Sequence, residues 1–437
     1  MTRVLLVTVG GSPEPILKAV ELHRPEEVIF ACSAPPCPTP SIEQVIGEGT
    51  PCEHRIDDRK EYRPNLVTQL NLEGFRPDLQ LIELPDPDDL NDCLLRLRAF
   101  VESLSARFNQ LELCGDFTGG TKSMSTALAF TLFDQQATLS VVSGRRDNLV
   151  RIEKSEGLWI VDPIPLLAQR LIEERLPPLL EAHYYERARS LVLDFQREQA
   201  QRLSPSQQKA LGGLDEQLQV LVLWDRFLWR DALEAAKACR FDQLWSELYA
   251  CWLRVEAAID WDPADDPAVA ITGYELVQDL LLNAERRGRR GWYDDAVARL
   301  YRATELLAQT YIRLELRLAT PPDTTGVMGL YRWLQDYEAI RGKGKAERGL
   351  GSIYAKHWRE LKRLFDARNR SLLGHGLRPI DQPTWQSLQD RVTNLLSIML
   401  RDLEIEQGPP PSQLPGLALL RQPLLHNLLN NLEINQS

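Results

Sequence analysis

The chain has 437 residues, of which 43% are hydrophobic and 26% charged, enough apolar material for two or three globular domains. No apolar run approaches the roughly 20 residues of a membrane-spanning helix, and the N-terminal apolar stretch ends at Gly10-Gly11 rather than at a cleavage site. The net charge of −11 argues against non-specific duplex binding over the whole surface. We therefore expect a cytoplasmic protein that does not associate with a membrane.

The seven cysteines are scattered, odd in number and never arranged as a C-x-x-C pair, which indicates neither a zinc knuckle nor a disulfide framework. Four histidines are isolated from one another, and we expect them to be surface or packing residues: His23, His54, His183 and His357. The sequence therefore predicts no bound metal and no resident cofactor.

The first third of the chain alternates short β-branched-rich runs with segments of helical periodicity. The predicted strands are 4–9, 27–31, 79–84, 111–114, 137–142 and 149–152, and the predicted helices are 14–22, 61–72, 88–108 and 122–134. The proline-containing segment 33–53 is predicted to be an irregular insertion. Such alternation predicts an α/β Rossmann-like domain with a mainly parallel sheet, whose binding sites lie in the loops that follow the strands.

From about residue 163 the strand signals stop and segments of 3.6-residue apolar periodicity continue to about residue 405. Clear examples are 218–238, 274–285, 293–318 and 352–372, with breaks at 321–322 and 341–351. A Gly-Pro-Pro-Pro run at 408–411 then begins a tail, which we expect to be a linker with one docking helix. The fold class is therefore α/β followed by all-α.

The first predicted strand is followed by Gly10-Gly11-Ser12-Pro13-Glu14-Pro15 and then by a helix. Glycines allow close approach of the backbone, proline is tolerated in a first helical turn, and the exposed N–H groups favour an anion. A plain tight turn explains the same residues. The run is not G-x-G-x-x-G, so a dinucleotide-dependent oxidoreductase is disfavoured.

The loop after the fourth predicted strand reads Asp116-Phe117-Thr118-Gly119-Gly120-Thr121-Lys122-Ser123-Met124, again followed by a helix. Two glycines, two hydroxyls and a lysine at a helix N-terminus suit a phosphate group. Thr121 separates Gly120 from Lys122, however, so the loop lacks the consecutive Gly-Lys-Ser/Thr of a P-loop. An NTPase is therefore disfavoured.

Together these two loops resemble those of the CRISPR-associated Rossmann fold (CARF) domain over roughly residues 1–160. The resemblance implies that the loops meet across a dimer two-fold axis and hold a cyclic oligoadenylate, with the tetra-adenylate favoured over the hexa-adenylate. The implied ligand-binding residues are Gly10, Gly11, Ser12, Thr118, Gly119, Gly120, Thr121, Lys122 and Ser123. Weaker candidates are Ser33 and either Arg145 or Arg146.

A cationic segment stands out in the second half of this acidic chain. Residues 341–370 contain ten basic residues and three acidic ones, a local balance of +7. A solvated helix face explains such a run as readily as a nucleic-acid contact does.

Within and just after it lies Ala367-Arg368-Asn369-Arg370-Ser371-Leu372-Leu373-Gly374-His375-Gly376, which resembles the Arg-x4–6-His signature of HEPN ribonucleases. Residues 291–306 resemble the packing helix of that domain, and the resemblance spans about 281–405. The signature alone is common by chance, and the tail holds a second copy at 421–426. We reject that copy because it contains a proline and lacks basic neighbours.

Helix geometry favours one of the two arginines. On a continuous helix, Arg368 and His375 face nearly the same way across roughly 10 Å of rise, whereas Arg370 points about 140° away from His375. Arg368 is therefore the first choice, and Arg370 is expected to contact the RNA backbone.

The resemblance implies a cyclic-oligoadenylate-activated endoribonuclease that cleaves single-stranded RNA without a metal, since RNA carries its own 2′-hydroxyl nucleophile. His375 would act as general acid or base, Arg368 would hold the phosphate, and Asn369 would orient the histidine or the phosphate. The products would be a 2′,3′-cyclic phosphate and a 5′-hydroxyl. Because the family builds this site from two facing protomers, we expect a homodimer.

The expected division is a sensor at 1–160, a helical connector at 161–280, a ribonuclease domain at 281–405 and a tail at 406–437. Two alternatives stay open. The chain is a ligand-responsive binding protein without catalysis, or its sensor is a ring nuclease that degrades its own ligand, with Thr121 or Lys122 placing the scissile phosphate.

Overall fold

The computed structural model describes residues 2–48, 50–53, 60–108, 110–133, 135, 137–147, 151–161, 163–259, 261–262, 269–318, 326–341, 349–404 and 412–421, with backbone alone for 50–53, 60–63, 105, 144–147, 151–158 and 341. The chain divides into two compact units, Met1–Leu167 and Ala168–Ser437. The expected four-part division stays a prediction.

The first unit is built on a six-stranded sheet with the strand order β5-β2-β1-β6-β7-β8. Its strands are β1 (Thr2–Thr8), β2 (Glu27–Ser33), β5 (Leu81–Leu84), β6 (Leu111–Asp116), β7 (Thr138–Asp147) and β8 (Arg151–Val161). All neighbours pair in parallel except β7 and β8, which form an antiparallel pair. The predicted mainly parallel sheet is confirmed.

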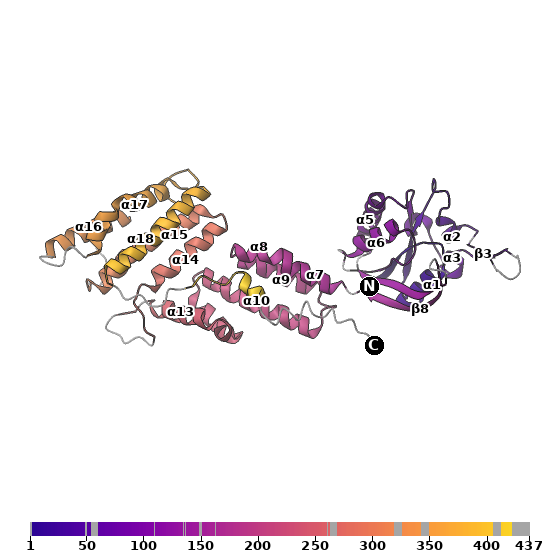
Figure 1. The fold of residues 1–437 in the computed structure, drawn as a ribbon, viewed down its shortest axis with the longest axis horizontal. Helices are drawn as coiled ribbons and strands as arrows, with labels where there is room; N and C mark the ends of the chain where they lie inside the picture. Colours follow the sequence, from indigo (N-terminus) through magenta and orange to yellow (C-terminus); the bar gives the residue numbers. More distant parts are fainter. Residues whose placement is uncertain are drawn as a thin grey trace. The chain divides into compact units, whose positions relative to one another are not determined.

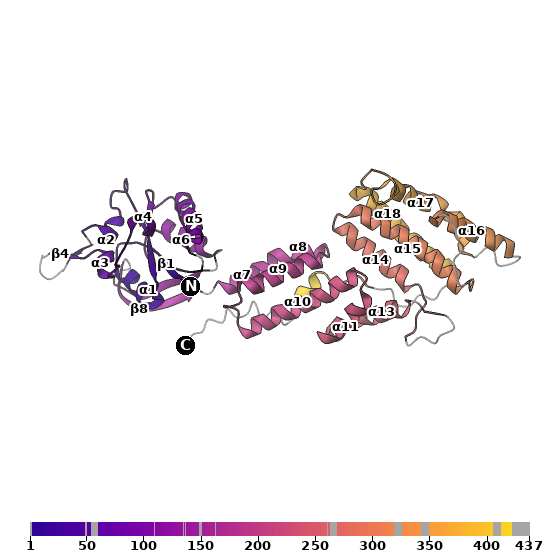
Figure 2. The same ribbon diagram turned by 180° about the vertical axis from the view of Figure 1, so that it is seen from behind.

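Helices cover both faces of this sheet (Figures 1 and 2). One face packs on α5 (Leu90–Arg107) and α6 (Lys122–Phe133), and the other packs on α1 (Glu14–His23), α2 (Ile42–Ile46) and α3 (Leu66–Gln69). A short helix, α4 (Pro77–Gln80), precedes β5. Because both faces are buried, the central strands read as continuous apolar runs, which is why the sequence located them.

Three predictions for this unit are wrong. The segment 33–53, expected to be irregular, contains α2 and the strand β3 (Thr50–Glu53). The expected helix 61–72 is instead the end of β4 (Lys60–Arg63), which pairs with β3 (Thr50–Glu53), and then α3. Pro64 interrupts the periodicity, and Asn65 begins the new helix by accepting a 2.9 Å hydrogen bond from the Thr68 N–H. The strand expected at 149–152 lies later in the chain, as β8, because its charged and glycine-containing sequence gives a weak strand signal.

The described part of the second unit is all helical, which confirms the predicted fold class. After α7 (Ile164–Arg170) and a π-turn (Leu171–Arg175), its elements are α8 (Leu176–Glu181), α9 (Tyr185–Glu198), α10 (Pro205–Asp225), α11 (Trp229–Ala238), α12 (Phe241–Leu244), α13 (Ser246–Ala257), α14 (Glu275–Arg289), α15 (Tyr293–Leu314), α16 (Gly326–Arg341), α17 (Leu350–Arg370) and α18 (Gln382–Asp402). The expected helix 218–238 is two helices, because Phe227 adopts a left-handed φ of 62° between α10 and α11.

The core of the C-terminal bundle forms around α15, which packs on α14, α16, α17 and α18 (Figure 1). None of the helices within the described ranges is long and apolar enough to cross a membrane. After α18, residues 412–421 return to the bundle and end in a 3₁₀ turn (Leu417–Arg421). Gln413 anchors this segment, since its Oε1 accepts a 2.6 Å hydrogen bond from Arg286 Nη1 and its Nε2 donates to the Leu282 carbonyl at 3.2 Å. The predicted docking helix is thus only a short turn in the described range.

Candidate functional site

The two glycine-rich loops of the first unit meet at the carboxyl edge of the sheet. Strands β1 and β6 are parallel neighbours, so the loops that follow them lie side by side. A Cβ at Gly10 would lie 2.6 Å from the Gly120 nitrogen, and a Cβ at Gly119 would lie 2.5 Å from the Thr8 carbonyl oxygen. Only glycine allows this approach of two backbones.

Hydrogen bonds from hydroxyl groups hold the second loop in place. The buried Thr8 Oγ1 donates to the Gly119 carbonyl at 2.7 Å, and Ser123 Oγ donates to the Asp88 carbonyl at 2.8 Å. Thr121 donates to the Pro87 carbonyl and also accepts from the Met124 N–H at 3.2 Å. The Thr121 and Ser123 hydroxyls therefore position the loop, and the sequence had suggested them only as ligand contacts.

Four residues at this edge differ in their surroundings. Lys122 is exposed at the first position of α6, and Gly11 has open space where a side chain would project. Ser12 Oγ donates to Glu14 Oε2 at 2.9 Å, and Thr118 Oγ1 accepts a 2.7 Å bond from the Val142 N–H. The Thr118 hydroxyl is also hydrogen-bonded to Asp116, so the edge presents backbone amides and one cation.

Of the weaker candidates, Ser33 is buried, and its hydroxyl is bonded to Ser41, from whose N–H it accepts at 2.7 Å. The side chains of Arg145 and Arg146 lie outside the described residues.

The helix that carries the second candidate site ends earlier than predicted. Helix α17 stops at Arg370, and Ser371 has an extended ψ of 162°. The Ser371 Oγ donates to the Arg368 carbonyl at 2.8 Å and so caps the helix end. The continuous helix to His375 is therefore wrong, and with it the argument from helix geometry that favoured Arg368 over Arg370.

Residues 371–378 instead fold back over the last turn of α17. The His375 N–H donates to the Asn369 carbonyl at 3.1 Å, and the Arg378 N–H donates to the Arg370 carbonyl at 3.0 Å. A Cβ on Gly374 would overlap the Arg368 carbonyl oxygen, and a Cβ on Gly376 would overlap that of Arg370. The two glycines therefore allow the reversal that places His375 beside Asn369.

A carboxylate from α15 ties down both ends of this loop, which we call the 371–380 loop. Asp294 Oδ1 accepts a 3.3 Å bond from the Leu372 N–H, and its Oδ2 accepts a 3.0 Å bond from the Ile380 N–H. The sequence does not reveal this role of Asp294, because an acidic residue in a first helical turn is ordinary.

The side chains of the candidate catalytic residues lie at the end of α17. The Arg368 guanidinium carbon lies 4.8 Å from the centre of the Tyr301 ring, and its Nη1 donates to Asn369 Oδ1 at 3.2 Å. Arg370 Nε donates to the Asp366 carbonyl at 3.1 Å. Asn369 and His375 are exposed. The fold thus brings together Arg368 with Asn369, and Asn369 with His375.

Helix α17 exposes basic side chains, and the loop after it exposes apolar ones. Arg359, Arg363 and Arg370 are exposed at spacings of four and seven residues, which puts them on one face of α17. Three leucines of the 371–380 loop are also exposed: Leu372 to 57%, Leu373 to 54% and Leu377 to 86%. Of the cationic segment, Lys343, Lys345 and Arg348 lie outside the described residues.

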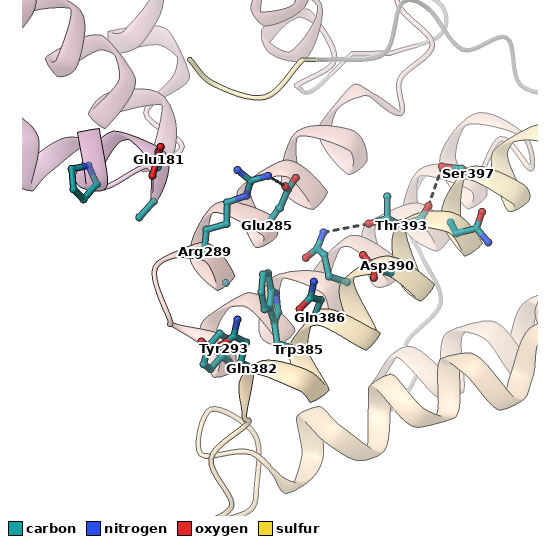
Figure 3. Close-up of a pocket in the computed structure, with 15 residues that line it drawn as sticks. Glu181, Glu285, Arg289, Tyr293, Gln382, Trp385, Gln386, Asp390, Thr393 and Ser397 are labelled. Atoms are coloured by element: carbon teal, nitrogen blue, oxygen red, sulfur yellow. Dashed lines mark hydrogen bonds and ion pairs between the residues drawn. The ribbon is translucent and has the colours of Figure 1, made fainter. Parts of the chain in front are cut away.

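A groove of about 1020 Å³ lies elsewhere in the bundle, between α8, α14 and α18 (Figure 3). Trp385 stacks on Tyr293 at 5.6 Å, and Arg289 pairs with Glu285 at 2.6 Å along its wall. None of Arg368, Asn369 and His375 lines it. The candidate catalytic residues thus lie outside this groove, with Asn369 and His375 exposed.

Comparisons with known proteins show which proteins this chain resembles. The model of the Csm6 HEPN domain matches residues 269–320, which contain all of α14 and α15 but not the 371–380 loop. The structure of Enterococcus italicus Csm6 bound to cyclic hexa-2′-fluoro-hexa-dAMP matches with a TM-score of 0.57 and 12% identity, over 98% of this chain and 99% of that one. No curated protein sequence matches significantly. The resemblance seen in the sequence is confirmed: residues 269–320 are similar to the Csm6 HEPN domain, and the fold of the chain is similar to that of E. italicus Csm6.

Proposed function

We propose that the chain is an endoribonuclease that cleaves single-stranded RNA without a metal and is activated by a cyclic oligoadenylate. The observation that carries this proposal is the 371–380 loop, which folds back so that His375 lies beside Asn369 at the exposed end of a basic helix. The Csm6 HEPN match on the neighbouring helices α14 and α15 supports it.

The proposed chemistry follows from the residue types. The RNA 2′-hydroxyl attacks the adjacent phosphate, and His375 removes its proton or protonates the departing 5′-oxygen. Arg368 has five N–H donors and uses one on Asn369, so others are available to stabilise charge that develops on the phosphate. Asn369 orients Arg368 or the phosphate. The products are a 2′,3′-cyclic phosphate and a 5′-hydroxyl.

We propose that two copies of the chain form the active site together. One copy supplies a single His375 on an open surface, and the three exposed leucines around it form an apolar patch that a second copy would cover. A two-fold axis through this patch would bring two His375 loops face to face. Arginines 359, 363 and 370 would then guide RNA phosphates toward the paired site.

The activator is proposed to bind at the carboxyl edge of the sheet in the first unit. Backbone amides of Gly10, Gly11, Gly119 and Gly120 with the cation of Lys122 suit phosphates, and the E. italicus protein binds a cyclic hexanucleotide analogue. Of the two ring sizes, we propose the tetra-adenylate. The other predicted residues of this site are Ser12, Thr118, Thr121 and Ser123, the last two holding the loop.

The decisive experiment measures cleavage of a labelled single-stranded RNA in EDTA with no activator, with cyclic tetra-adenylate and with cyclic hexa-adenylate. We expect little cleavage without activator and strong cleavage with the tetra-adenylate, ending in cyclic phosphates. Loss of activity in EDTA would contradict the metal-free mechanism, and stronger activation by the hexa-adenylate would contradict the ring size.

Two variants locate the site. His375→Ala should abolish cleavage while cyclic oligoadenylate binding is retained. The control, His357→Ala, changes a histidine in α17 away from the loop and should cleave normally. Unchanged cleavage by His375→Ala would remove the assigned site.

A further inference from the structure

A second region of the helical unit concentrates positive charge away from both proposed sites. Near the C-terminal end of α14, three arginine side chains surround one carboxylate, that of Asp225 at the end of α10. Arg286 Nε lies 2.8 Å, Arg290 Nη1 2.7 Å and Arg287 Nη2 3.3 Å from its oxygens. All three arginines are largely buried, with side-chain exposures of 0%, 6% and 12% for Arg286, Arg290 and Arg287.

The described carboxylates around this cluster do not balance it. Asp279 is buried beside it but accepts hydrogen bonds from two indoles, Trp224 at 2.9 Å and Trp229 at 3.4 Å. Asp295 is shared between Arg287, at 3.5 Å, and Arg299, at 3.2 Å. Burial of a cation without a full counter-charge is costly, so an anion that enters here is favoured.

The pKa shifts of residues in and beside the cluster agree with an excess of positive charge. Burial lowers the pKa of Arg287, and the neighbouring Arg290 and Arg299 lower it further against the effect of Asp225. Burial and then the nearby arginines lower the pKa of His183 to about 3. Burial would raise the pKa of Asp225, but Arg286, Arg290 and Arg287 lower it overall.

A cavity of about 330 Å³ opens onto this cluster, a volume at the lower end of small-ligand pockets. Four arginines and two carboxylates are among the residues that line it: Arg187, Arg226, Arg287, Arg290, Glu186 and Asp225. Arg187 is exposed at the mouth and makes no ion pair with any described residue, while Arg226 pairs with Glu186. The buried Nε atoms of Arg287 and Arg290 lack hydrogen-bond partners in the described part of the chain.

Aromatic side chains form another wall of the cavity. The left-handed Gly291, with a φ of 81°, turns the chain so that the Trp292 N–H bonds back to the Arg287 carbonyl at 3.0 Å. The Trp292 ring lies edge-to-face with Tyr184 at 5.8 Å, and it remains 45% exposed. The guanidinium carbons of Arg287 and Arg290 lie over this ring, 5.3 and 5.8 Å from its centre. A nucleobase stacked on the exposed part of the ring would therefore place its phosphate near these groups.

We infer that this cavity, which we call the Arg290–Trp292 pocket, binds a nucleotide that carries a phosphate monoester. Arg187, Arg226, Arg287 and Arg290 hold the phosphate, and Trp292 stacks on the base. The pocket contains none of the residues proposed for activator binding or RNA cleavage, so the inference does not depend on the proposed function.

The test measures binding of adenosine 5′-monophosphate, adenosine and inorganic phosphate to the full chain by isothermal titration calorimetry. The double variant Arg187→Gln/Arg226→Gln removes two cations at the mouth without entering the core. Its matched control, Arg197→Gln/Arg230→Gln, changes two other exposed arginines, on α9 and α11. We expect the pocket variant to bind the nucleotide at least about tenfold more weakly and the control to bind as the unmodified chain does.

A second variant tests the base. Trp292→Leu should weaken nucleotide binding and leave phosphate binding unchanged, with circular dichroism confirming the fold. Equal affinity of the pocket variant and its control would overturn the inference, as would absence of nucleotide binding by the unmodified chain. Loss of binding in Lys122→Ala with the pocket variant unaffected would place the nucleotide at the sensor and also overturn it. Phosphate binding as tightly as the nucleotide would overturn the nucleotide assignment.

Discussion

At the scale of single residues, the two arginines at the end of α17 have different surroundings. Arg368 lies over the Tyr301 ring and contacts Asn369, so its guanidinium is fixed close to the residue that holds His375. The Arg370 side chain is exposed, and its only hydrogen bond to the described residues is to a backbone carbonyl of its own helix. This difference replaces the incorrect argument from helix geometry as the reason to prefer Arg368.

We predict that Arg368→Ala lowers kcat for RNA cleavage about 100-fold or more, because a donor to the developing phosphate charge is lost. Arg370→Ala should mainly raise KM, since the loss of one backbone phosphate contact weakens RNA binding. Steady-state kinetics on one RNA separates the two effects. The reverse pattern would make Arg370 the catalytic arginine.

His183 gives a prediction about pH. Burial lowers its pKa to about 3, whereas an unfolded histidine titrates near 6.5. As the pH falls below 6.5, the unfolded chain binds a proton that the folded chain does not, so stability falls by up to about 1.4 kcal/mol per pH unit.

Replacement by asparagine removes this titration and suits the left-handed φ of 56° at this position. We predict that His183→Asn is less stable at pH 7.5, because the 2.6 Å bond to Tyr185 is lost, but loses less stability between pH 6.5 and 4.5. Urea unfolding followed by tryptophan fluorescence at several pH values checks this. Parallel pH profiles for the two proteins would contradict it.

At the scale of elements, the sequence predicted what depends on local patterns. Apolar runs located the parallel strands, and the loops after β1 and β6 were correctly expected at one edge, since parallel strands end on the same side. The hydroxyls of Thr121 and Ser123 were assigned to a ligand, because their carbonyl partners at 87 and 88 are more than 30 residues away in the chain.

The end of α17 was also mispredicted because the contacts that form it do not appear in the local sequence pattern. Arg368 to Leu372 continue an amphipathic helical pattern, and only the two glycines beyond them indicate a stop. Their function is steric, since each avoids an overlap with a carbonyl of the preceding turn. The clamp on the loop comes from Asp294, which is about 80 residues earlier, so neither periodicity nor spacing reveals it.

We predict that Asp294→Asn loosens the 371–380 loop. Its two backbone bonds lose a charged acceptor, which we expect to lower the free energy of unfolding by about 1–2 kcal/mol. Because His375 is then less well placed, we expect kcat to fall about tenfold with little change in KM. The control is Asp295→Asn, which changes the adjacent carboxylate that pairs with Arg287 and Arg299. Equal losses of kcat in both variants would mean that Asp294 has no special effect on the loop.

At the scale of the whole molecule, one copy of the chain leaves the proposed chemistry incomplete. The 371–380 loop exposes a histidine, an asparagine and three leucines on an open surface, whereas the cavities at the α8–α14–α18 groove and at the Arg290–Trp292 pocket lie apart from it. Exposed leucines in a loop held by two glycines and a carboxylate clamp favour a partner surface over a solvent-facing role.

The leucines therefore give the last prediction. Leu377→Glu places a charge at the most exposed point of the patch, and we expect it to shift the chain from dimer toward monomer at micromolar concentration and to reduce RNA cleavage in parallel. Light scattering coupled to size-exclusion chromatography gives the mass, and the cleavage assay gives the activity. The control is Ile340→Glu on α16, because Ile340 is 85% exposed and Leu377 is 86% exposed, so the two variants place the same charge at equal exposure.

If both variants remain dimeric and active, the leucine patch is not the surface that joins the two copies. If Leu377→Glu is monomeric but cleaves RNA at the normal rate, a single His375 is sufficient and the paired site is wrong. Only joint loss of dimer and activity in Leu377→Glu, with neither lost in Ile340→Glu, agrees with a site assembled from two loops, because dilution of the dimer then removes catalysis while each chain stays folded.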